Sequence, residues 1–227
     1  MSRVFVVGAA GKVGRRLVKR LADTGHTVVA LHRRADQSDE LQTLGAIPVL
    51  GSLTELDPPA LAHLMVGSDA VIFTAGAGGA GIELTNAIDG RGLELSVEAA
   101  RLAGVRRFIL VSAFPEAARG KAMSEGFENY MQIKKLADVY LASSDLDWVI
   151  VRPGTLVDRP GTGAVRAGLA IPYGEIPRDD VAAFLAAVVG QAGVSRRIIE
   201  LTEGDVPVEK AVAGLTGVSE ILCSGIT

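Results

Sequence analysis

The sequence predicts an α/β fold in which a doubly wound parallel sheet is flanked by helices. Short apolar runs, typical of strands that are buried on both faces, alternate with segments of helical periodicity along the 227 residues. The first apolar run, Val4 to Val7, breaks into glycines and then passes directly into a helical pattern at Lys12. Because crossovers between parallel strands are right-handed, this alternation winds into a sheet with helices on both faces.

The individual elements follow in order from the same patterns. Predicted strands cover residues 4–7, 27–31, 47–50, 70–73, 107–111, 148–151 and 197–201. Predicted helices cover residues 12–22, 39–44, 58–65, 83–103, 127–142, 179–189 and 207–215. Pro58 and Pro59 suit the first turn of one helix, and Asp179 or Asp180 is expected to cap another.

Two stretches depart from this alternation. Residues 114–126 have no periodicity and are rich in small and charged side chains, which predicts a mobile loop. Residues 158–177 hold much of the remaining glycine and proline, which predicts a small lobe or hairpin on the substrate side. We expect a single domain over residues 1–227 that includes this C-terminal substrate lobe.

Composition limits the possible functions. The net charge of −3 and the pI near 5.7 give no basic surface for nucleic acid. No apolar run approaches the length of a signal peptide core or a membrane span. The single cysteine, Cys223, excludes an intramolecular disulfide and disfavours a cysteine metal site. We therefore expect a cytoplasmic protein with a small-molecule substrate and no metal, nucleic-acid or membrane partner; monomer and homodimer both stay open.

The glycine turn after the first strand predicts a phosphate site. Gly8 allows a tight turn, Gly11 lets a ligand approach the backbone, and Gly14 lets the helix pack closely against the strand. The free amides and the dipole at the start of that helix favour a pyrophosphate. The spacing is Gly-x-x-Gly-x-x-Gly, so a tight connection without a ligand is the alternative.

The second strand predicts which dinucleotide binds. It runs directly into His32-Arg33-Arg34, about twenty residues after the glycine turn, where nicotinamide-binding folds contact the adenosine ribose. An acidic side chain there would repel a 2′-phosphate, whereas Arg33 and Arg34 would bind it. The sequence therefore favours NADP over NAD, and a pair of solvated surface arginines is the alternative.

A second loop of small residues, 74–81, follows the fourth strand. Ligands of open α/β sheets lie outside the carboxyl ends of the strands. We therefore expect Ala75, Gly76 and Ala77 to lie along the nicotinamide half of the cofactor. A flexible connection without ligand contact is the alternative, above all for Gly78 to Gly81.

Three residues suggest a chemical step. Tyr130 and Lys134 are one helical turn apart and so share a helix face, and Ser112 stands at the carboxyl end of the fifth strand. The Lys134 ammonium and an oxidised nicotinamide would both favour the tyrosine phenolate, and Lys134 could also hold the nicotinamide ribose. Ser112 would hydrogen-bond the substrate oxygen. The alternative is an ordinary amphipathic helix with a half-buried tyrosine and a surface lysine.

Together these motifs resemble those of the atypical short-chain dehydrogenase/reductases. The resemblance rests on the glycine turn, the 108–112 strand, Tyr130-x-x-x-Lys134 and the 148–154 run, and it is greatest to small bacterial NAD(P)H-binding proteins of oxidoreductase or sugar-epimerase type. It implies a Rossmann-like fold and a catalytic set of Ser112, Tyr130 and Lys134. It also implies cofactor contacts, which together with the loop and arginine predictions comprise Gly8, Ala10, Gly11, Lys12, Val13, Gly14, Arg33, Arg34, Ser52, Leu53, Ala75, Gly76, Ala77, Lys134, Pro153, Gly154 and Thr155.

The resemblance implies an activity but leaves the substrate open. Relatives usually have aspartate where Ser52 stands, to hold the adenine amino group, so that contact is weaker or differently made here. The leading hypothesis is an NADP-dependent oxidoreductase that transfers a hydride between the nicotinamide and a small carbonyl, quinone or flavin-type substrate. The alternatives are a non-catalytic NADP(H)-binding redox-responsive regulator and a sugar epimerase-like enzyme.

Overall fold

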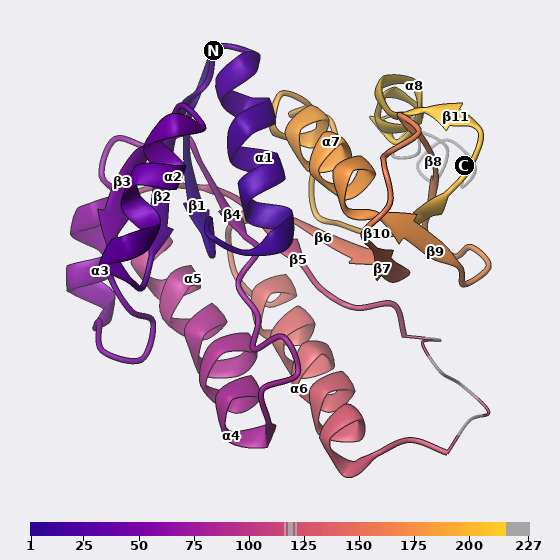
Figure 1. Cartoon of the computed structure of the whole chain (residues 1–227), viewed down its shortest axis with the longest axis horizontal. Helices are drawn as coiled ribbons and strands as arrows, with labels where there is room; N and C mark the ends of the chain where they lie inside the picture. Colours follow the sequence, from indigo (N-terminus) through magenta and orange to yellow (C-terminus); the bar gives the residue numbers. More distant parts are fainter. Residues whose placement is uncertain (116, 118–119, 121, 217–227) are drawn as a thin grey trace, which may run out of the picture.

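A nine-stranded sheet forms the centre of the molecule (Figure 1), in a computed structural model that describes residues 1–115, 117, 120 and 122–216. Seven strands run parallel to one another: β1 (Arg3–Val7), β2 (Thr27–His32), β3 (Ile47–Leu50), β4 (Ala70–Phe73), β5 (Arg107–Val111), β6 (Asp147–Pro153) and β10 (Arg197–Glu203). Two short strands, β8 (Ala164–Gly168) and β11 (Val206–Pro207), complete one edge, and β8 is antiparallel to both of its neighbours. The order is β11-β8-β10-β6-β5-β4-β1-β2-β3.

The predicted doubly wound sheet is confirmed, because the strand order reverses between β1 and β4. Helices connect the parallel strands: α1 (Lys12–Asp23), α2 (Ser38–Thr43), α3 (Pro58–Met65), α5 (Gly92–Leu102), α6 (Glu125–Ala142) and α7 (Arg178–Val189). A short 3-10 turn, η1 (Ala35–Gln37), precedes α2, and α8 (Val208–Gly214) follows β11. The carboxyl ends of the seven parallel strands therefore share one edge of the sheet.

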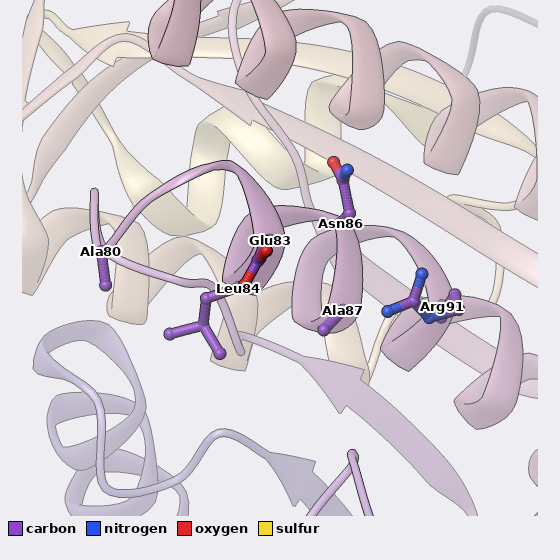
Figure 2. Close-up of a pocket in the computed structure, with 6 residues that line it drawn as sticks. All are labelled: Ala80, Glu83, Leu84, Asn86, Ala87 and Arg91. Atoms are coloured by element: carbon purple, nitrogen blue, oxygen red, sulfur yellow. The ribbon is translucent and has the colours of Figure 1, made fainter.

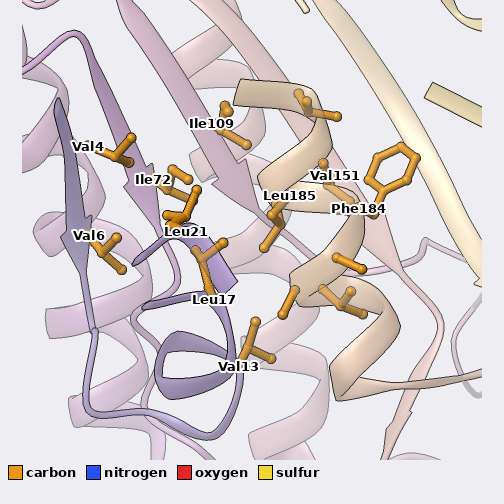
Figure 3. Packing of buried hydrophobic residues seen from close by; sticks show 14 of the residues in the cluster. Val4, Val6, Val13, Leu17, Leu21, Ile72, Ile109, Val151, Phe184 and Leu185 are labelled. Atoms are coloured by element: carbon orange, nitrogen blue, oxygen red, sulfur yellow. The ribbon is translucent and has the colours of Figure 1, made fainter. Parts of the chain in front are cut away.

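Alternating side chains of the strands fill two hydrophobic layers. On β1, Val4 and Val6 belong to the layer under α1 and α7, whereas Phe5 and Val7 belong to the layer under α3, α5 and α6. Figure 3 shows the first layer, where Leu17 of α1 and Leu185 of α7 approach the strands. Burial on both faces explains why the strands appear in the sequence as continuous apolar runs.

The long helix predicted for residues 83–103 is divided into three parts. It begins as α4 (Ile82–Thr85), widens into a π-helical segment, η2 (Asn86–Arg91), and continues as α5. Such widened turns occur often at functional sites. Here the widened turn carries Asp89, whose side chain is buried.

The predicted lobe at residues 158–177 lies partly inside the sheet. Its strand β8 pairs with β10, and β9 (Glu175–Pro177) pairs in parallel with β7 (Thr155–Val157) in a separate two-stranded sheet. The expectation that Asp179 or Asp180 caps α7 is wrong, because Pro177 is the N-cap residue. Asp180 instead accepts hydrogen bonds from the Thr162 and Gly163 amides, at 2.9 and 2.8 Å, and so fixes the loop before β8.

Other element boundaries shift by a few residues. Helix α6 begins at Glu125, where the Ser124 hydroxyl accepts a hydrogen bond from the Phe127 amide. Residues 116, 118, 119 and 121 of the predicted loop, and Cys223, lie outside the described residues. In the part of the chain that the structure describes, no helix is long and apolar enough to cross a membrane, and no cluster of three metal-ligating side chains occurs.

Candidate functional site

The glycine turn is packed so tightly that side chains cannot replace its hydrogens. Gly8 has a φ of +81°, and a Cβ there would lie 2.5 Å from the Ala75 nitrogen. A Cβ on Gly14 would lie 2.3 Å from the Gly8 carbonyl oxygen. The Thr74 hydroxyl donates to the Val7 and Gly8 carbonyls, at 3.0 and 3.2 Å. The two predicted cofactor loops, 8–14 and 75–77, therefore lie directly against each other.

Helix α1 presents its first amides next to this turn. Gly11 is the N-cap and has no side chain with which to cap them, and the first amides of a helix have no partner inside it. The Val13 side chain is buried in the core, so only its backbone can reach a ligand. A glycine cradle, free amides and the positive end of a helix dipole together fit the diphosphate of a dinucleotide.

An ion-pair cluster that the sequence did not predict surrounds Lys12. Its ammonium lies 2.7 Å from Asp158, and the Arg178 guanidinium lies 2.9 Å from the same carboxylate. The hydrogen bond from Lys12, followed by the charges of Arg178, Lys12 and Arg16, lowers the pKa of Asp158 despite some desolvation. Asp158 thus links the start of α1 to the start of α7.

The two predicted phosphate-binding arginines differ in their surroundings. Both side chains are exposed, and Arg34 pairs with Asp36 at 3.1 Å. Arg33 makes no hydrogen bond or ion pair to any described residue. Beneath them the buried His32 ring donates from Nδ1 to the Arg34 carbonyl, at 2.9 Å, since a carbonyl can only accept. Of the two arginines, Arg33 is therefore the one whose guanidinium is not already paired with a described carboxylate.

The turn after β3, which the sequence predicts to contact the cofactor, has its side chains engaged within the protein. The Ser52 hydroxyl is 2.8 Å from the Thr54 hydroxyl and also accepts from the Thr54 amide, at 3.3 Å. Leu53 packs on the helix that follows β4, because a Cβ on Gly92 would lie 3.1 Å from Leu53 Cδ1. Ser52 is thus engaged within its own turn.

A cavity of about 760 Å³ lies at the carboxyl ends of β5 and β6 and brings several predicted residues together. Ser112 and Tyr130 line it, as do Pro153, Gly154 and Thr155 from the end of β6 and the start of β7. Lys134 is not among its lining residues. The rest of the lining consists of Ala113, Phe114, Ala117, Phe127, Met131, Leu156, Tyr173, Gly174, Glu175 and Arg178.

Aromatic side chains form much of this cavity wall. Phe114 and Tyr173 pack edge to face with ring centroids 5.3 Å apart, and the Tyr173 hydroxyl is hydrogen-bonded to Thr155. Phe127 packs on Tyr130 with centroids 6.2 Å apart. The segment before α7 therefore helps to enclose the cavity, on the side predicted for the substrate.

Lys134 is held in a buried ion pair and is not part of the cavity wall. Its ammonium is 3.3 Å from Asp89 Oδ1 and donates to the Val111 carbonyl, at 2.9 Å. The other Asp89 oxygen accepts from the Ala77 amide, at 2.9 Å. The lysine, the widened helix turn and the loop after β4 are thus held together by one carboxylate. Nothing near Asp89 in the sequence marks it, because its partners come from two distant segments.

The surroundings of Tyr130 favour the neutral phenol. Burial raises the pKa of Tyr130, Lys134 lowers it, and the negative charges of Asp89 and Asp138 raise it again, so the pKa lies above its ordinary value. The Lys134 ammonium is 5.9 Å from the Tyr130 ring centroid and lowers the pKa of Tyr130, as expected from the sequence. Burial and the two carboxylates raise the pKa of Tyr130 by more than Lys134 lowers it, in the protein without a bound cofactor.

A second buried carboxylate lies further along α6. Asp138 pairs with Arg152 at 2.9 Å. Burial raises its pKa, although the Ser112 hydroxyl and Arg152 act in the opposite direction. Ser112 Oγ finds no partner of good hydrogen-bond geometry among the described residues. Asp138 lies one turn after Lys134, so helical spacing could have identified this residue.

A second, separate pocket of about 510 Å³ lies along α4 and η2 (Figure 2). Its lining residues are Ala80, Glu83, Leu84, Asn86, Ala87 and Arg91. In Figure 2 the Leu84 and Ala87 side chains point to the opposite side of the helix from Asn86. The Asn86 side chain accepts a hydrogen bond from Asn129 of α6, at 3.0 Å.

Comparisons with known proteins agree with this geometry. A family model described as NAD(P)H-binding matches residues 8–192. The chain is 40% identical over 215 residues to the uncharacterized sugar epimerase YhfK of Bacillus subtilis, covering 94% of this chain and all of that one. The structure superposes with a TM-score of 0.87 and 36% identity on a candidate NAD-dependent epimerase/dehydratase from Bacillus halodurans, covering 95% and 100% of the two chains.

A third similarity is to an enzyme with a reductase name. The anaerobillin reductase ChuY from Escherichia coli O157:H7 gives a TM-score of 0.75 at 25% identity, covering 90% of this chain and 98% of that one. The family match spans the glycine turn, the Ser112 strand and the Tyr130 helix. The chain therefore belongs to the NAD(P)H-binding family of Rossmann-like proteins, as the resemblance to atypical short-chain dehydrogenase/reductases implied.

Proposed function

We propose that this protein is an NADP-dependent reductase that transfers a hydride to a small carbonyl, quinone or flavin-type substrate. The observation that supports this most is the meeting of Ser112 and Tyr130 in one cavity at the carboxyl edge of the sheet. That edge is where doubly wound sheets bind their ligands. The nicotinamide would supply the hydride, and the glycine turn with the start of α1 would hold its diphosphate.

Each residue of the cavity would then have one role. Tyr130, held as a phenol by its surroundings, would donate its Oη proton to the substrate oxygen. Ser112 would donate a hydrogen bond to the same oxygen, because its buried Oγ has no hydrogen bond of good geometry to a described residue, although it lies near enough to Asp138 to lower the pKa of that carboxyl. The aromatic rings of Phe114, Phe127 and Tyr173 would exclude water and favour a flat, largely apolar substrate.

A second candidate is a binding protein that responds to NADP(H) without turnover. It is favoured by the position of Lys134, whose ammonium is held by Asp89 and the Val111 carbonyl and does not line the cavity. The name of the Bacillus subtilis relative supports epimerisation of a sugar as a third candidate function. A panel of carbonyl compounds, quinones and flavins separates them: net oxidation of NADPH supports the reductase, and tight binding without oxidation of any compound supports the binding protein. An epimerase would convert a sugar without net change in the cofactor.

The preference for NADP is tested at Arg33. We expect Arg33→Ala to weaken NADPH binding roughly 10- to 100-fold, because charge-assisted hydrogen bonds to the 2′-phosphate are lost. NADH, which lacks that phosphate, should bind within about twofold of wild type by the same argument. Fluorescence titration of both reduced cofactors measures the difference. Equal losses for NADPH and NADH would contradict recognition of the phosphate by this side chain.

A further inference from the structure

We infer that His32 strengthens the preference for NADPH by holding the backbone on both sides of Arg33, so that the Arg33 guanidinium is presented to the 2′-phosphate. His32 is in this sense a positioning residue, because its buried ring acts through Arg33 and does not itself contact the cofactor. The inference rests on the proposed recognition of NADP by Arg33 and adds the group that prepares this arginine for binding.

The buried His32 ring joins separate parts of the chain after β2. It belongs to the last residue of β2, which is only 3% exposed. Its Nδ1 donates to the Arg34 carbonyl, at 2.9 Å, and its Nε2 lies 3.1 Å from the Ser38 hydroxyl at the start of α2. Because Nδ1 carries the hydrogen, Nε2 of the neutral ring is an acceptor and Ser38 is the donor. The ring therefore spans the loop that contains Arg33.

Further hydrogen bonds close this loop on both sides of Arg33. The Arg34 amide donates to Gln37 Oε1, at 3.2 Å, and the Gln37 amide donates back to the Arg34 carbonyl, at 3.1 Å. On the other side, the His32 carbonyl accepts from the Gly51 amide, at 2.9 Å. Both backbone neighbours of Arg33 are thus fixed, whereas its own side chain is exposed and bonds to no described residue.

The same end of β2 lies against the glycine turn. The Ala9 amide of that turn donates to the Leu31 carbonyl, at 3.2 Å, one residue before His32. The 2′-phosphate is carried by the adenosine ribose, which nicotinamide-binding folds contact at the end of the second strand. Fixing the backbone around Arg33 in advance reduces the conformational entropy that is lost when the phosphate binds. His32 therefore raises affinity for a cofactor that carries this phosphate and not for one that lacks it.

The test measures how NADPH and NADH bind when the His32 ring is removed. We expect His32→Leu to weaken NADPH binding roughly 3- to 10-fold, which is within the net contribution of one hydrogen bond. NADH should bind within about twofold of wild type, because it has no phosphate for Arg33 to contact. Fluorescence titration of both reduced cofactors measures the dissociation constants. An unchanged affinity for NADPH would overturn the inference.

Two polar replacements keep the test decisive if the leucine variant does not fold. The short amide of His32→Asn can still donate to the Arg34 carbonyl, so this variant should keep most of the affinity for NADPH. The longer amide of His32→Gln extends towards Ser38 instead, so this variant should lose affinity for NADPH but not for NADH. Equal NADPH affinities of His32→Gln and wild type would contradict a role of the bond to Arg34.

A double variant shows whether His32 acts through Arg33. In the Arg33→Ala background, His32→Leu should cause no further loss of NADPH affinity, because the side chain that the ring positions is already absent. A merely structural role of the ring would weaken NADPH and NADH alike, and its effect would add to that of Arg33→Ala. Either of those results would overturn the inference.

Controls separate this inference from the function on which it rests. His26→Leu removes a half-buried histidine just before the opposite end of β2, where Nδ1 accepts from the Ser2 amide at 3.3 Å, and it should change neither affinity. A selective loss of NADPH affinity in Arg33→Ala but not in His32→Leu would overturn the positioning role and leave NADP recognition intact. Equal losses of NADPH and NADH in Arg33→Ala would overturn both.

Discussion

Tyr130→Phe is expected to lower kcat by about 10²- to 10⁴-fold, the usual contribution of a positioned proton donor. The substitution removes only Oη and keeps the ring, which packs on Phe127 and faces the Lys134 ammonium. Affinity for NADPH should therefore stay within a few-fold of wild type. Steady-state oxidation of NADPH with any accepted substrate, together with a binding titration, measures both quantities.

A control on the same helix tests whether the effect belongs to the site. Tyr140→Phe removes a hydroxyl from an exposed tyrosine two to three turns further along α6 and should leave kcat unchanged. Full turnover by Tyr130→Phe would exclude the tyrosine as the proton donor. A parallel loss of NADPH binding would instead assign it a structural role.

The pH profile of reduction should report the same group. Burial and the charges of Asp89 and Asp138 place the pKa of Tyr130 above 10, so the donor form is present throughout the neutral range. Because the protonated form is the active one, kcat should be lost only as pH rises through this raised pKa. Lys134 lowers that pKa, so Lys134→Met should move the alkaline limb to higher pH. Initial rates between pH 6 and 11, in a buffer of constant ionic strength, measure the shift. An alkaline limb near neutrality in the wild type would contradict the assignment.

The parts of this site that could be predicted are those that depend on short sequence patterns, such as apolar runs and residue spacing. Buried parallel strands appear as apolar runs, so the edge that carries Ser112 followed from their order. One-turn spacing placed Tyr130 and Lys134 on one helix face, and the glycine spacing located the turn before α1. In each case the residues that matter lie within one element or directly after it.

The residues that could not be predicted depend on contacts between distant segments. Asp89 meets Lys134 and Ala77 only because the widened turn η2 packs on α6. Asp180 appeared to be a helix cap from its position in the sequence, but the amides it accepts from belong to the loop before β8. A carboxylate near a helix start can satisfy either its own helix or a neighbouring segment, and only tertiary packing decides between them.

Removing the carboxylate of Asp89 is expected to lower the free energy of unfolding by about 3–5 kcal/mol, the usual result when one partner of a buried ion pair is lost. Both side chains are almost completely buried, so Asp89→Ala would leave the Lys134 ammonium in the interior without its carboxylate, with the Val111 carbonyl as hydrogen-bond acceptor and the Tyr130 ring nearby. The Ala77 amide would also lose its acceptor. Urea unfolding followed by circular dichroism measures the change.

A comparison of single and double variants separates the loss of the charge from the loss of packing. Asp89→Leu should destabilise strongly, whereas Asp89→Leu combined with Lys134→Met should recover most of the stability, because apolar replacement of a whole buried pair is often neutral. Asp23→Ala breaks the exposed pair with Lys19 and should cost less than about 1 kcal/mol. If the double variant were as unstable as Asp89→Leu, the carboxylate would act through the Ala77 loop rather than through the lysine. Asp89→Asn then measures the contribution of the hydrogen bond from the Ala77 amide. The asparagine side-chain oxygen can still accept that bond but offers no charge to Lys134.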